Sequence, residues 1–300
     1  MNCQKWLKRY EAGLAGKTVV LFGATGGIGK ELCRYILMLG GKLITVDRNR
    51  EKAASNTAEL KAAFSQGEIT NLYADLADFA SVQAVTEELK KLEIDILVHN
   101  AGAYSIPRCT TSLGFDNVFQ INFVAPYYIT TALLPLLSQR KGRVVAVGSI
   151  AHNYSKTDPK DWDFSSRKQA SLVYGNAKRH LMYALLQLSK AHPAVAFSVA
   201  HPGITFTNIT NHYPRLIFAI IKHPMKVIFM KPREAALSIV MGMFENTEPY
   251  SWIGPRFFNV WGLPGKKPLR RATPEEIARI YQKARDIAES IAKSAKHYCL

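Results

Sequence analysis

Short apolar runs alternate with longer segments of mixed polarity along the first two thirds of the chain. The runs are rich in strand-favouring residues and have the length of buried parallel strands. They cover residues 18–22, 42–47, 69–73, 94–99, 143–149 and 195–200. The segments between them are helical in composition or periodicity, at 30–39, 51–64, 81–92, 114–136 and 171–190. This alternation predicts an α/β fold, with a doubly wound parallel β-sheet of about seven strands flanked by helices.

The last third of the chain is less regular, and we expect it to form a C-terminal lid over a binding site. Within residues 205–265, the apolar stretch 213–230 has cations at its borders. Buried over the sheet, this stretch forms a pocket for an apolar ligand. Exposed, it contacts an anionic membrane surface instead. A helix is expected at 232–243, and the Gly- and Pro-broken aromatic stretch after it is expected to pack beside the pocket.

The C-terminal residues 266–300 are expected to contain one amphipathic helix. Thr273-Pro-Glu-Glu276 is a capping signature with proline at the first helical position. The apolar stripe that follows packs either on the body of the protein or on a partner, which includes a second copy of this chain. With a short arm at 1–16 and a core at 17–204, the prediction is a single domain over residues 1–300.

Composition narrows the class of protein. No stretch approaches the roughly 18–20 uninterrupted apolar residues of a membrane-spanning helix, and the charged N-terminus does not resemble a signal peptide. We therefore expect a cytoplasmic protein, with peripheral membrane contact as the alternative. The net charge of +16 comes from dispersed residues, which favours an anionic cofactor or lipid over nucleic acid. The scattered cysteines and histidines show no metal-ligand spacing, so no metal site is expected.

A strand, a glycine turn and a helix start follow one another at residues 18–30, with the spacing Gly23-x-x-x-Gly27-x-Gly29. Gly23 allows the sharp turn, Gly27 lets the backbone approach a pyrophosphate, and Gly29 lets the helix pack close to the sheet. The N–H groups of the helix N-terminus then face the phosphates. Thr25 and Ile28 lie within the turn and are predicted to bind the cofactor too. The alternative is a glycine-rich turn without a ligand.

Polar residues follow the ends of the expected strands, where open α/β sheets bind their ligands. Asp47 is placed to accept the hydroxyls of an adenosine ribose, or else it is a helix N-cap or a turn residue. Arg48 is placed to pair with a 2′-phosphate, but Asp47 would repel that group, so NAD is favoured over NADP. Asp75, with Leu76, borders the adenine, or Asp75 caps the following helix. Two further strand ends carry Asn100, Ala101, Gly102 and Ser149.

Tyr174 and Lys178 are one helical turn apart and share a face of the helix expected at 171–190. A tyrosine with a pKa of about 10 is a poor base near neutrality. A nearby ammonium stabilises the phenolate and lowers that pKa, and it can also hold ribose hydroxyls. Ser149, at a strand end, can orient a substrate oxygen. A surface pair is the alternative for Tyr174 and Lys178 taken alone, but the other motifs argue against it.

Taken together and in this order, the motifs resemble those of the short-chain dehydrogenase/reductase superfamily, over about residues 16–210. The resemblance implies a Rossmann-type fold and a tetrad. In that tetrad, Tyr174 is the acid/base, Lys178 lowers its pKa and binds the ribose, and Ser149 orients the reacting oxygen. Asn122 holds a water that links Lys178 to bulk solvent. The alternative for Asn122, a polar residue in an apolar helix, is a structural side chain bonded to backbone.

The resemblance also implies that Pro202 and Gly203 border the cofactor and that Thr207 bonds the nicotinamide carboxamide. Phe22 and His99 depart from the family's usual residues at positions that do no chemistry. The insert at 151–170 and the C-terminal tail resemble the retinol-dehydrogenase-like branch. We therefore expect an NAD(P)-dependent oxidoreductase that interconverts an alcohol and a carbonyl on a lipophilic substrate. The alternative from another class is an NAD(P)-binding regulatory module without turnover.

Overall fold

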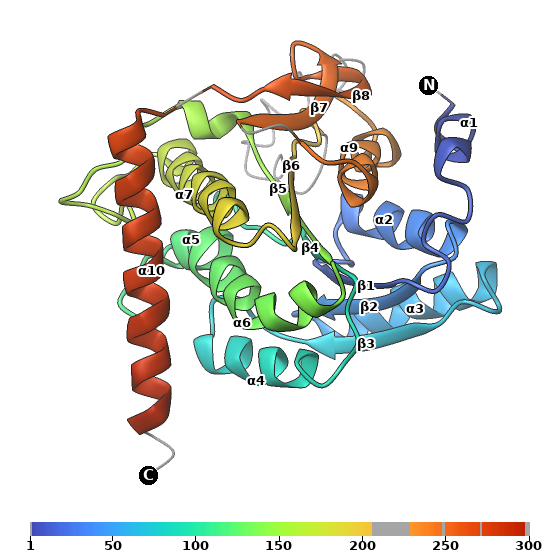
Figure 1. Cartoon of the computed structure of the whole chain (residues 1–300), viewed down its shortest axis with the longest axis horizontal. Helices are drawn as coiled ribbons and strands as arrows, with labels where there is room; N and C mark the ends of the chain where they lie inside the picture. The colour runs from blue at the N-terminus through green and yellow to red at the C-terminus, as the bar shows by residue number, and fades with distance from the viewer. Residues whose placement is uncertain (1, 206–228, 248–249, 271, 298–300) are drawn as a thin grey trace.

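One eight-stranded sheet organises the chain (Figure 1). The computed structural model describes residues 2–205, 229–247, 250–270 and 272–297. The strand order is β3-β2-β1-β4-β5-β6-β7-β8, in which all neighbours are parallel except β7 and β8. The strands are β1 (Thr18–Phe22), β2 (Lys42–Asp47), β3 (Ile69–Tyr73), β4 (Ile96–His99), β5 (Arg143–Val147), β6 (Ala196–Ala200), β7 (Ser251–Phe257) and β8 (Trp261–Pro268).

The doubly wound parallel sheet is confirmed, and each of its first six strands lies where the apolar runs predicted it. The order reverses on the two sides of β1, so the carboxyl ends of β1 and β4 border the crevice where such sheets bind ligands. The last two strands were not predicted, because glycine and proline interrupt residues 251–268. They form a hairpin whose second strand, β8, makes the antiparallel edge of the sheet.

Helices cover both faces of the sheet (Figure 1). One face is packed by α4, α6 and α7, with α10 against the outside of α7 and α6, and the other by α1, α2, α3 and α9. The helical elements are α1 (Cys3–Leu7), η1 (Lys8–Tyr10), α2 (Gly27–Met38), α3 (Arg50–Ala63), α4 (Phe79–Leu89), α5 (Asn117–Phe119), η2 (Gln120–Val124), α6 (Ala125–Gln139), η3 (Ile150–Asn153), α7 (Ala170–Ala191), α9 (Pro232–Phe244) and α10 (Pro274–His297).

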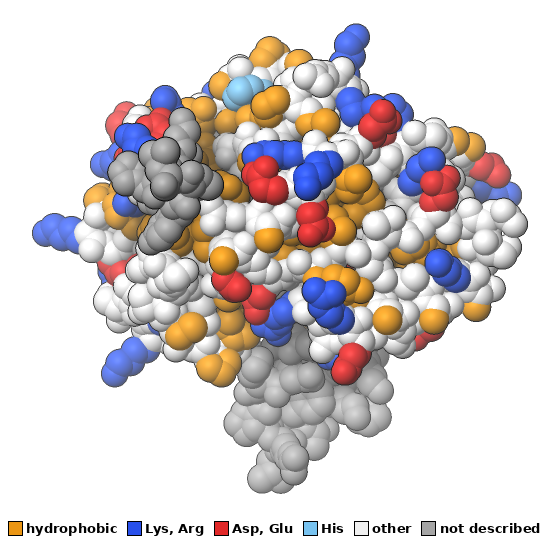
Figure 2. All heavy atoms as spheres, turned by 90° about the horizontal axis from the view of Figure 1, so that it is seen from below, with side chains coloured by type: hydrophobic (Ala, Val, Ile, Leu, Met, Phe, Trp, Pro, Cys, Tyr) orange, Lys and Arg blue, Asp and Glu red, His pale blue; other side chains and the backbone are white. Residues whose placement is uncertain are grey.

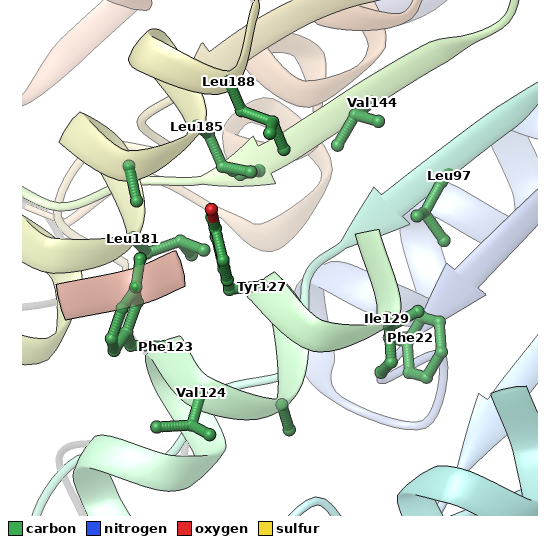
Figure 3. Close-up of a cluster of buried hydrophobic side chains, with 14 of the residues drawn as sticks. Phe22, Leu97, Phe123, Val124, Tyr127, Ile129, Val144, Leu181, Leu185 and Leu188 are labelled. Atoms are coloured by element: carbon green, nitrogen blue, oxygen red, sulfur yellow. The ribbon is translucent and has the colours of Figure 1, made fainter. Parts of the chain in front are cut away.

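The continuous apolar strands supply both halves of the core. Along β1, Val20 and Phe22 pack toward α4, α6 and α7, whereas Val19 and Leu21 pack toward α2 and α9. Alternate residues of a strand face opposite sides of the sheet, so a strand buried on both sides has no polar face. Figure 3 shows part of the first half, where Tyr127 and its apolar neighbours from α6 and α7 lie over the sheet.

The helix predicted at 114–136 begins at Asn117 and runs to Gln139, with a π-helical turn, η2, inside it. By length and composition, Asn117–Gln139 is long and apolar enough to cross a membrane. Yet 67% of its most apolar window is buried inside the protein. It therefore has the character of an inner core helix, and its composition alone does not identify a membrane span.

The C-terminal helix packs on the body of the protein. The predicted stripe lies against the core cluster that contains α7 and α6: Ile277, Ile280, Ala284, Ile287 and Ile291 are buried in it, and Tyr281 is partly buried against it. The lid was predicted over residues 205–265, but residues 232–265 contribute α9, β7 and part of β8 to the sheet and its helical layer. The lid therefore covers less of the sequence than predicted. Residues 206–228, with most of the stretch 213–230, lie outside the described residues.

Candidate active site

The glycine turn has the geometry of an anion-binding site. Gly23 has a φ of 83°, and a Cβ there would lie 2.8 Å from the Cα of Ala101. A Cβ on Gly29 would lie 2.0 Å from the carbonyl oxygen of Gly23, so α2 can pack on the turn only because Gly29 has no side chain. α2 begins at the exposed Gly27, and Gly26 supplies no side-chain cap. Its first backbone N–H groups are therefore available to an anion.

The end of β4 lies directly beside this turn. The Asn100 Nδ2 donates a hydrogen bond to the carbonyl oxygen of Gly23 at 2.8 Å. Two residues later, a Cβ on Gly102 would lie 2.7 Å from Asn122 Oδ1 and 3.6 Å from Lys178 Nζ. The segment from Asn100 to Gly102 therefore lies between the glycine turn and the side chains of Asn122 and Lys178.

Asp47 lies at the end of β2, as predicted, but its carboxylate is turned inward. The residue is only 3% exposed, and its Oδ1 accepts hydrogen bonds of 2.9 Å from both the backbone N and the hydroxyl of Thr25. Its Oδ2 is buried and has no hydrogen-bond partner among the described residues. Burial raises the pKa of Asp47, although the Thr25 bonds act in the opposite direction. The cap of α3 is Asn49, so the capping alternative for Asp47 is wrong.

Asp75 and Leu76 follow β3 at the same edge of the sheet. The Oδ2 of Asp75 lies 3.7 Å from a guanidinium nitrogen of Arg48, whose side chain is 72% exposed. The side chain that caps α4 belongs to Asp78, so the capping alternative for Asp75 is also wrong. Leu76 is buried, and its carbonyl oxygen accepts a hydrogen bond of 3.0 Å from Gln120.

Ser149, Tyr174 and Lys178 meet at the carboxyl end of β5. Ser149 caps η3 just after the strand, and its side chain is hydrogen-bonded to the Tyr174 hydroxyl. The Lys178 Nζ donates to the carbonyl oxygen of Val147 at 2.9 Å and lies 5.7 Å from the centre of the Tyr174 ring. The one-turn spacing on α7 therefore brings both side chains to the same strand end, as predicted.

Burial shifts the pKa values of both α7 side chains. It raises the pKa of Tyr174 to about 12, although the hydrogen bond with Ser149 acts to lower it. It lowers the pKa of Lys178, which is 2% exposed, to about 8. In the protein alone, desolvation therefore outweighs the contacts that favour the phenolate. The lowering of the Tyr174 pKa by Lys178 stays a prediction. Below about pH 8, Lys178 is still a cation beside the phenol.

Asn122 lies in the π-helical turn η2 and is fully buried. Its Nδ2 donates to the carbonyl oxygens of Ala103 at 2.7 Å and Val118 at 2.8 Å, which is the structural role expected of a buried asparagine. Its Oδ1 has no hydrogen-bond partner among the described residues and points to the position beside Gly102 and Lys178. A buried acceptor without a partner at this place fits a water molecule or a ligand hydroxyl.

A cavity of about 560 Å³ opens over these groups. Its wall unites three of the four predicted catalytic side chains with residues that follow β4 and β6 and with Ile28 of α2. The predicted site residues that line it are Ile28, Asn100, Gly102, Ser149, Tyr174, Lys178, Pro202 and Gly203. The predicted adenosine-end residues Asp47, Arg48 and Asp75 lie at the neighbouring strand ends instead. Thr207 lies outside the described residues.

Sequence reasoning missed the aromatic wall of the cavity. The Tyr104 ring meets the Tyr174 ring edge-on at 5.3 Å between centroids, and Tyr154, Ile204 and Phe229 also line the space. Tyr104 follows Gly102 by two residues, and that closeness to a predicted strand end was the available signal. Phe229 belongs to the stretch 213–230 that was predicted to form a pocket, and Tyr154 belongs to the insert after β5, but the sequence singled out neither residue.

A buried ion pair behind the site was also missed. Arg179, next to Lys178 on α7, makes two hydrogen bonds of 2.7 and 2.6 Å to the carboxylate of Glu276 at the start of α10. It also donates to the carbonyl oxygen of His152 at 3.0 Å, and the His152 ring contacts the carbonyl oxygen of Ser149 at 2.6 Å. The capping signature that contains Glu276 marked a helix start, but nothing in it indicated a partner so distant in the sequence.

Comparisons with known proteins agree with this geometry. A family model described as short chain dehydrogenase matches residues 17–215. Retinol dehydrogenase 14 of Mus musculus is 29% identical over 292 residues, which cover 91% of this chain and 85% of that protein. Polyprenol dehydrogenase of Mus musculus is 27% identical over 280 residues, covering 88% and 81%. An uncharacterized protein from Mycobacterium paratuberculosis has the same fold, with a TM-score of 0.74 at 23% identity over 93% of this chain and 97% of that one.

The family match spans the glycine turn, Ser149 and the Tyr174–Lys178 pair, and the similarity to retinol dehydrogenase 14 covers 91% of the chain. NAD(P)-dependent dehydrogenase activity on CH–OH groups follows from this membership and from the relatives. The chain belongs to the short-chain dehydrogenase family and falls with its retinol-dehydrogenase-like members.

Proposed function

We propose that this enzyme interconverts an alcohol and a carbonyl group on a lipophilic substrate, with Tyr174 as the acid/base. The observation that carries the proposal is the meeting of Tyr174, Ser149 and Lys178 at one end of the cavity. A phenol, a hydroxyl hydrogen-bonded to it and a buried amine form a compact device for moving a proton to or from a substrate oxygen.

The described residues fit a nicotinamide dinucleotide. The uncapped start of α2 suits its pyrophosphate. At the other end, Lys178 and the unpartnered Oδ1 of Asn122 suit ribose hydroxyls or a water beside them. Pro202 and Gly203 suit the nicotinamide side of the cavity. When bound, the cofactor supplies or accepts the hydride.

In this proposal, Ser149 and Tyr174 both bond the substrate oxygen and hold it at the end of β5. During reduction the Tyr174 hydroxyl gives its proton to that oxygen, and during oxidation the phenolate takes the proton back. Lys178 favours the phenolate as long as it is charged, which holds below its pKa of about 8.

The substrate is proposed to be lipophilic because aromatic and aliphatic side chains line the cavity around the catalytic groups. Tyr104, Ile150, Tyr154, Ile204 and Phe229 all line it. A space of about 560 Å³ has the size of a typical small-molecule site. The names of the retinol and polyprenol dehydrogenases among the relatives point to the same class of substrate.

For the adenosine end, the sequence favoured NAD because Asp47 would repel a 2′-phosphate. The inward turn of the Asp47 carboxylate toward Thr25 weakens that reason. The exposed side chains of Arg48 and Arg50 occupy the same edge. We therefore propose NADP, with these guanidinium groups on its 2′-phosphate.

Turnover of a graded panel of alcohols and carbonyls tests the function, followed by the absorbance of the reduced nicotinamide with each cofactor. The proposal expects activity that rises with substrate hydrophobicity. Best turnover of small polar alcohols would contradict the lipophilic assignment. Cofactor binding without turnover of any member of the panel would support the regulatory module instead.

Side-by-side kcat/KM values with NAD and NADP test the cofactor assignment. Arg48→Ala should lower the value for NADP far more than that for NAD. Lys61→Ala, which removes an exposed cation elsewhere on α3, should leave the ratio unchanged. A wild-type preference for NAD would overturn the assignment and restore Asp47 as the ribose ligand.

A further inference from the structure

The turn between β7 and β8 holds three large apolar side chains in solvent. Phe257 is 62% exposed, Phe258 is 84% exposed and Trp261 is 41% exposed, and together we call them the aromatic turn. Phe257 and Trp261 are directly opposed in the strand pairing, so they share one face of the hairpin. Isolated exposed apolar residues are common, but three within five positions of one turn form a patch.

The backbone conformation of this turn is unfavourable for a phenylalanine at position 258. Phe258 and Asn259 both have positive φ, at 51° and 60°, and the N–H of Val260 bonds to the carbonyl oxygen of Phe257 at 2.9 Å. Tight hairpin turns with two such residues favour Asn or Gly at the first position. A bulky residue there is an outlier, and strain of this kind marks positions selected for something other than stability. Phe258 therefore has no evident structural role at this position.

The sequence that contains the aromatic turn carries cations and no carboxylate. Between Glu248 and Glu275 the sequence has no acidic residue, and its cations are Arg256, Lys266, Lys267, Arg270 and Arg271. Lys266 pairs with Glu245 at the base of the hairpin. Elsewhere the charges are mixed: Figure 2, seen from below the view of Figure 1, shows basic and acidic side chains interspersed on that face. The hairpin lies at the opposite edge of the molecule, at the top of Figure 1.

The aromatic turn is joined to the wall of the active-site cavity. The His201 Nε2 contacts the carbonyl oxygen of Asn259 at 3.1 Å, and a Cβ on Gly203 would lie 2.8 Å from the carbonyl oxygen of Val260. Both His201 and Gly203 line the cavity. A surface that holds the aromatic turn would therefore hold the cavity close to itself.

We propose that the aromatic turn docks this enzyme on an anionic lipid bilayer. Exposed Phe and Trp side chains partition into the interfacial region of a membrane, and flanking cations add attraction to anionic lipids. The aromatic turn is a different part of the sequence from residues 213–230, for which membrane contact was the alternative to a buried lid. The docking proposal depends only on this surface. The further claim, that docking brings the cavity close to its substrate, rests on the proposed function.

Vesicle sedimentation of the full chain tests the docking, with vesicles of phosphatidylcholine alone or mixed with phosphatidylserine. The wild type should bind the mixed vesicles at low salt and be released as salt rises. The double variant Phe257→Ser/Phe258→Asn should lower the partition constant by at least about tenfold, the order expected for one large apolar side chain. Met38→Gln is the matched control, because Met38 is 42% exposed on α2, and it should bind as the wild type does.

Thermal unfolding of Phe258→Asn alone separates docking from folding. Because asparagine tolerates positive φ better than phenylalanine, this variant should be at least as stable as the wild type while binding vesicles less. Equal vesicle binding by the double variant and the wild type would overturn the proposal, as would a wild type that ignores both kinds of vesicle. Loss of self-association in the variant, without vesicle binding by either protein, would overturn it in favour of a protein interface.

Turnover separates this inference from the proposed function. The double variant should keep the wild-type rate on a soluble alcohol or carbonyl and lose rate only on a substrate embedded in mixed vesicles. If the wild type turned over no substrate yet bound mixed vesicles through the aromatic turn, the proposed function would fail while the docking would stand. An equal loss on soluble and embedded substrates would contradict the delivery role.

Discussion

Removing one partner of the Arg179–Glu276 ion pair should destabilise the fold strongly, because both side chains are only 8% exposed and the remaining charge would be buried without its partner. The ion pair connects α7, which carries Tyr174 and Lys178, to the start of α10. Burial opposes ionisation of Glu276, but hydrogen bonds from Arg179 and Thr157 prevail and lower its pKa to about 2. The carboxylate therefore stays charged across the working pH range and depends on its partner.

Arg179→Met removes the guanidinium and leaves that carboxylate buried without its partner. Breaking a buried pair in this way costs about 3–5 kcal/mol in the free energy of unfolding. The double variant Arg179→Met/Glu276→Gln should lose much less than the sum of the two single losses, since no unpaired charge remains. Turnover should fall in Arg179→Met as well, because Arg179 holds the carbonyl oxygen of His152, whose ring contacts Ser149.

Urea unfolding at neutral pH, read as the midpoint at unchanged slope, measures the loss. Arg285→Met is the matched control: its pair with Glu289 lies on the same helix with side chains 53% and 56% exposed, and exposed pairs are worth at most about 1 kcal/mol. A loss below about 1 kcal/mol for Arg179→Met, or one equal to that of Arg285→Met, would refute this reasoning. The pH dependence gives a second check. The contribution of a depressed carboxyl pKa is present above the ordinary value of 4.5 and fades as pH falls toward about 2.

Two further predictions concern the cofactor turn and the buried lysine. Gly29→Ala should abolish cofactor binding and destabilise the fold, because its Cβ would lie 2.0 Å from a carbonyl oxygen. Gly26→Ala should be tolerated, because its Cβ would meet no atom closer than 3.9 Å. Titration calorimetry with the cofactor checks both variants. The Lys178 pKa is lowered from 10.5 to about 8, so the unfolded chain binds more protons in that window and wild-type stability should rise with pH there relative to Lys178→Met. Parallel pH-dependent unfolding curves for the two proteins would contradict the burial of a titrating lysine.

The sheet was predictable because its first six strands are buried on both faces and therefore appear as continuous apolar runs. The same logic located the site, since strand ends in a parallel sheet meet at one edge, and Gly23, Asn100 and Ser149 each follow a strand. The hairpin of β7 and β8 was not predictable in this way. Gly254, Pro255 and Gly262 interrupt the pattern of an edge hairpin that tolerates them.

The sequence predicted where the site residues lie in the fold better than it predicted the surroundings of their side chains. The spacing of Tyr174 and Lys178 predicted that they share a face, but the direction of the Tyr174 pKa shift depends on how completely the fold buries it. Asp47 was placed at the right strand end, whereas its inward turn depends on a hydrogen bond to Thr25 that no periodicity reveals. Contacts between residues far apart in the sequence, such as Arg179 and Glu276, are likewise not revealed by periodicity.

Turnover of Tyr174→Phe, measured together with its cofactor affinity, tests the central claim most directly. The substitution removes the hydroxyl and keeps the ring that packs edge-on against Tyr104. The account predicts a loss in kcat of at least about a hundredfold, the lower end of general acid–base contributions, with cofactor affinity little changed. Tyr104→Phe, which removes a hydroxyl from the opposing ring, should retain most of the wild-type turnover. Wild-type turnover in Tyr174→Phe would contradict the assignment of Tyr174 as the proton donor.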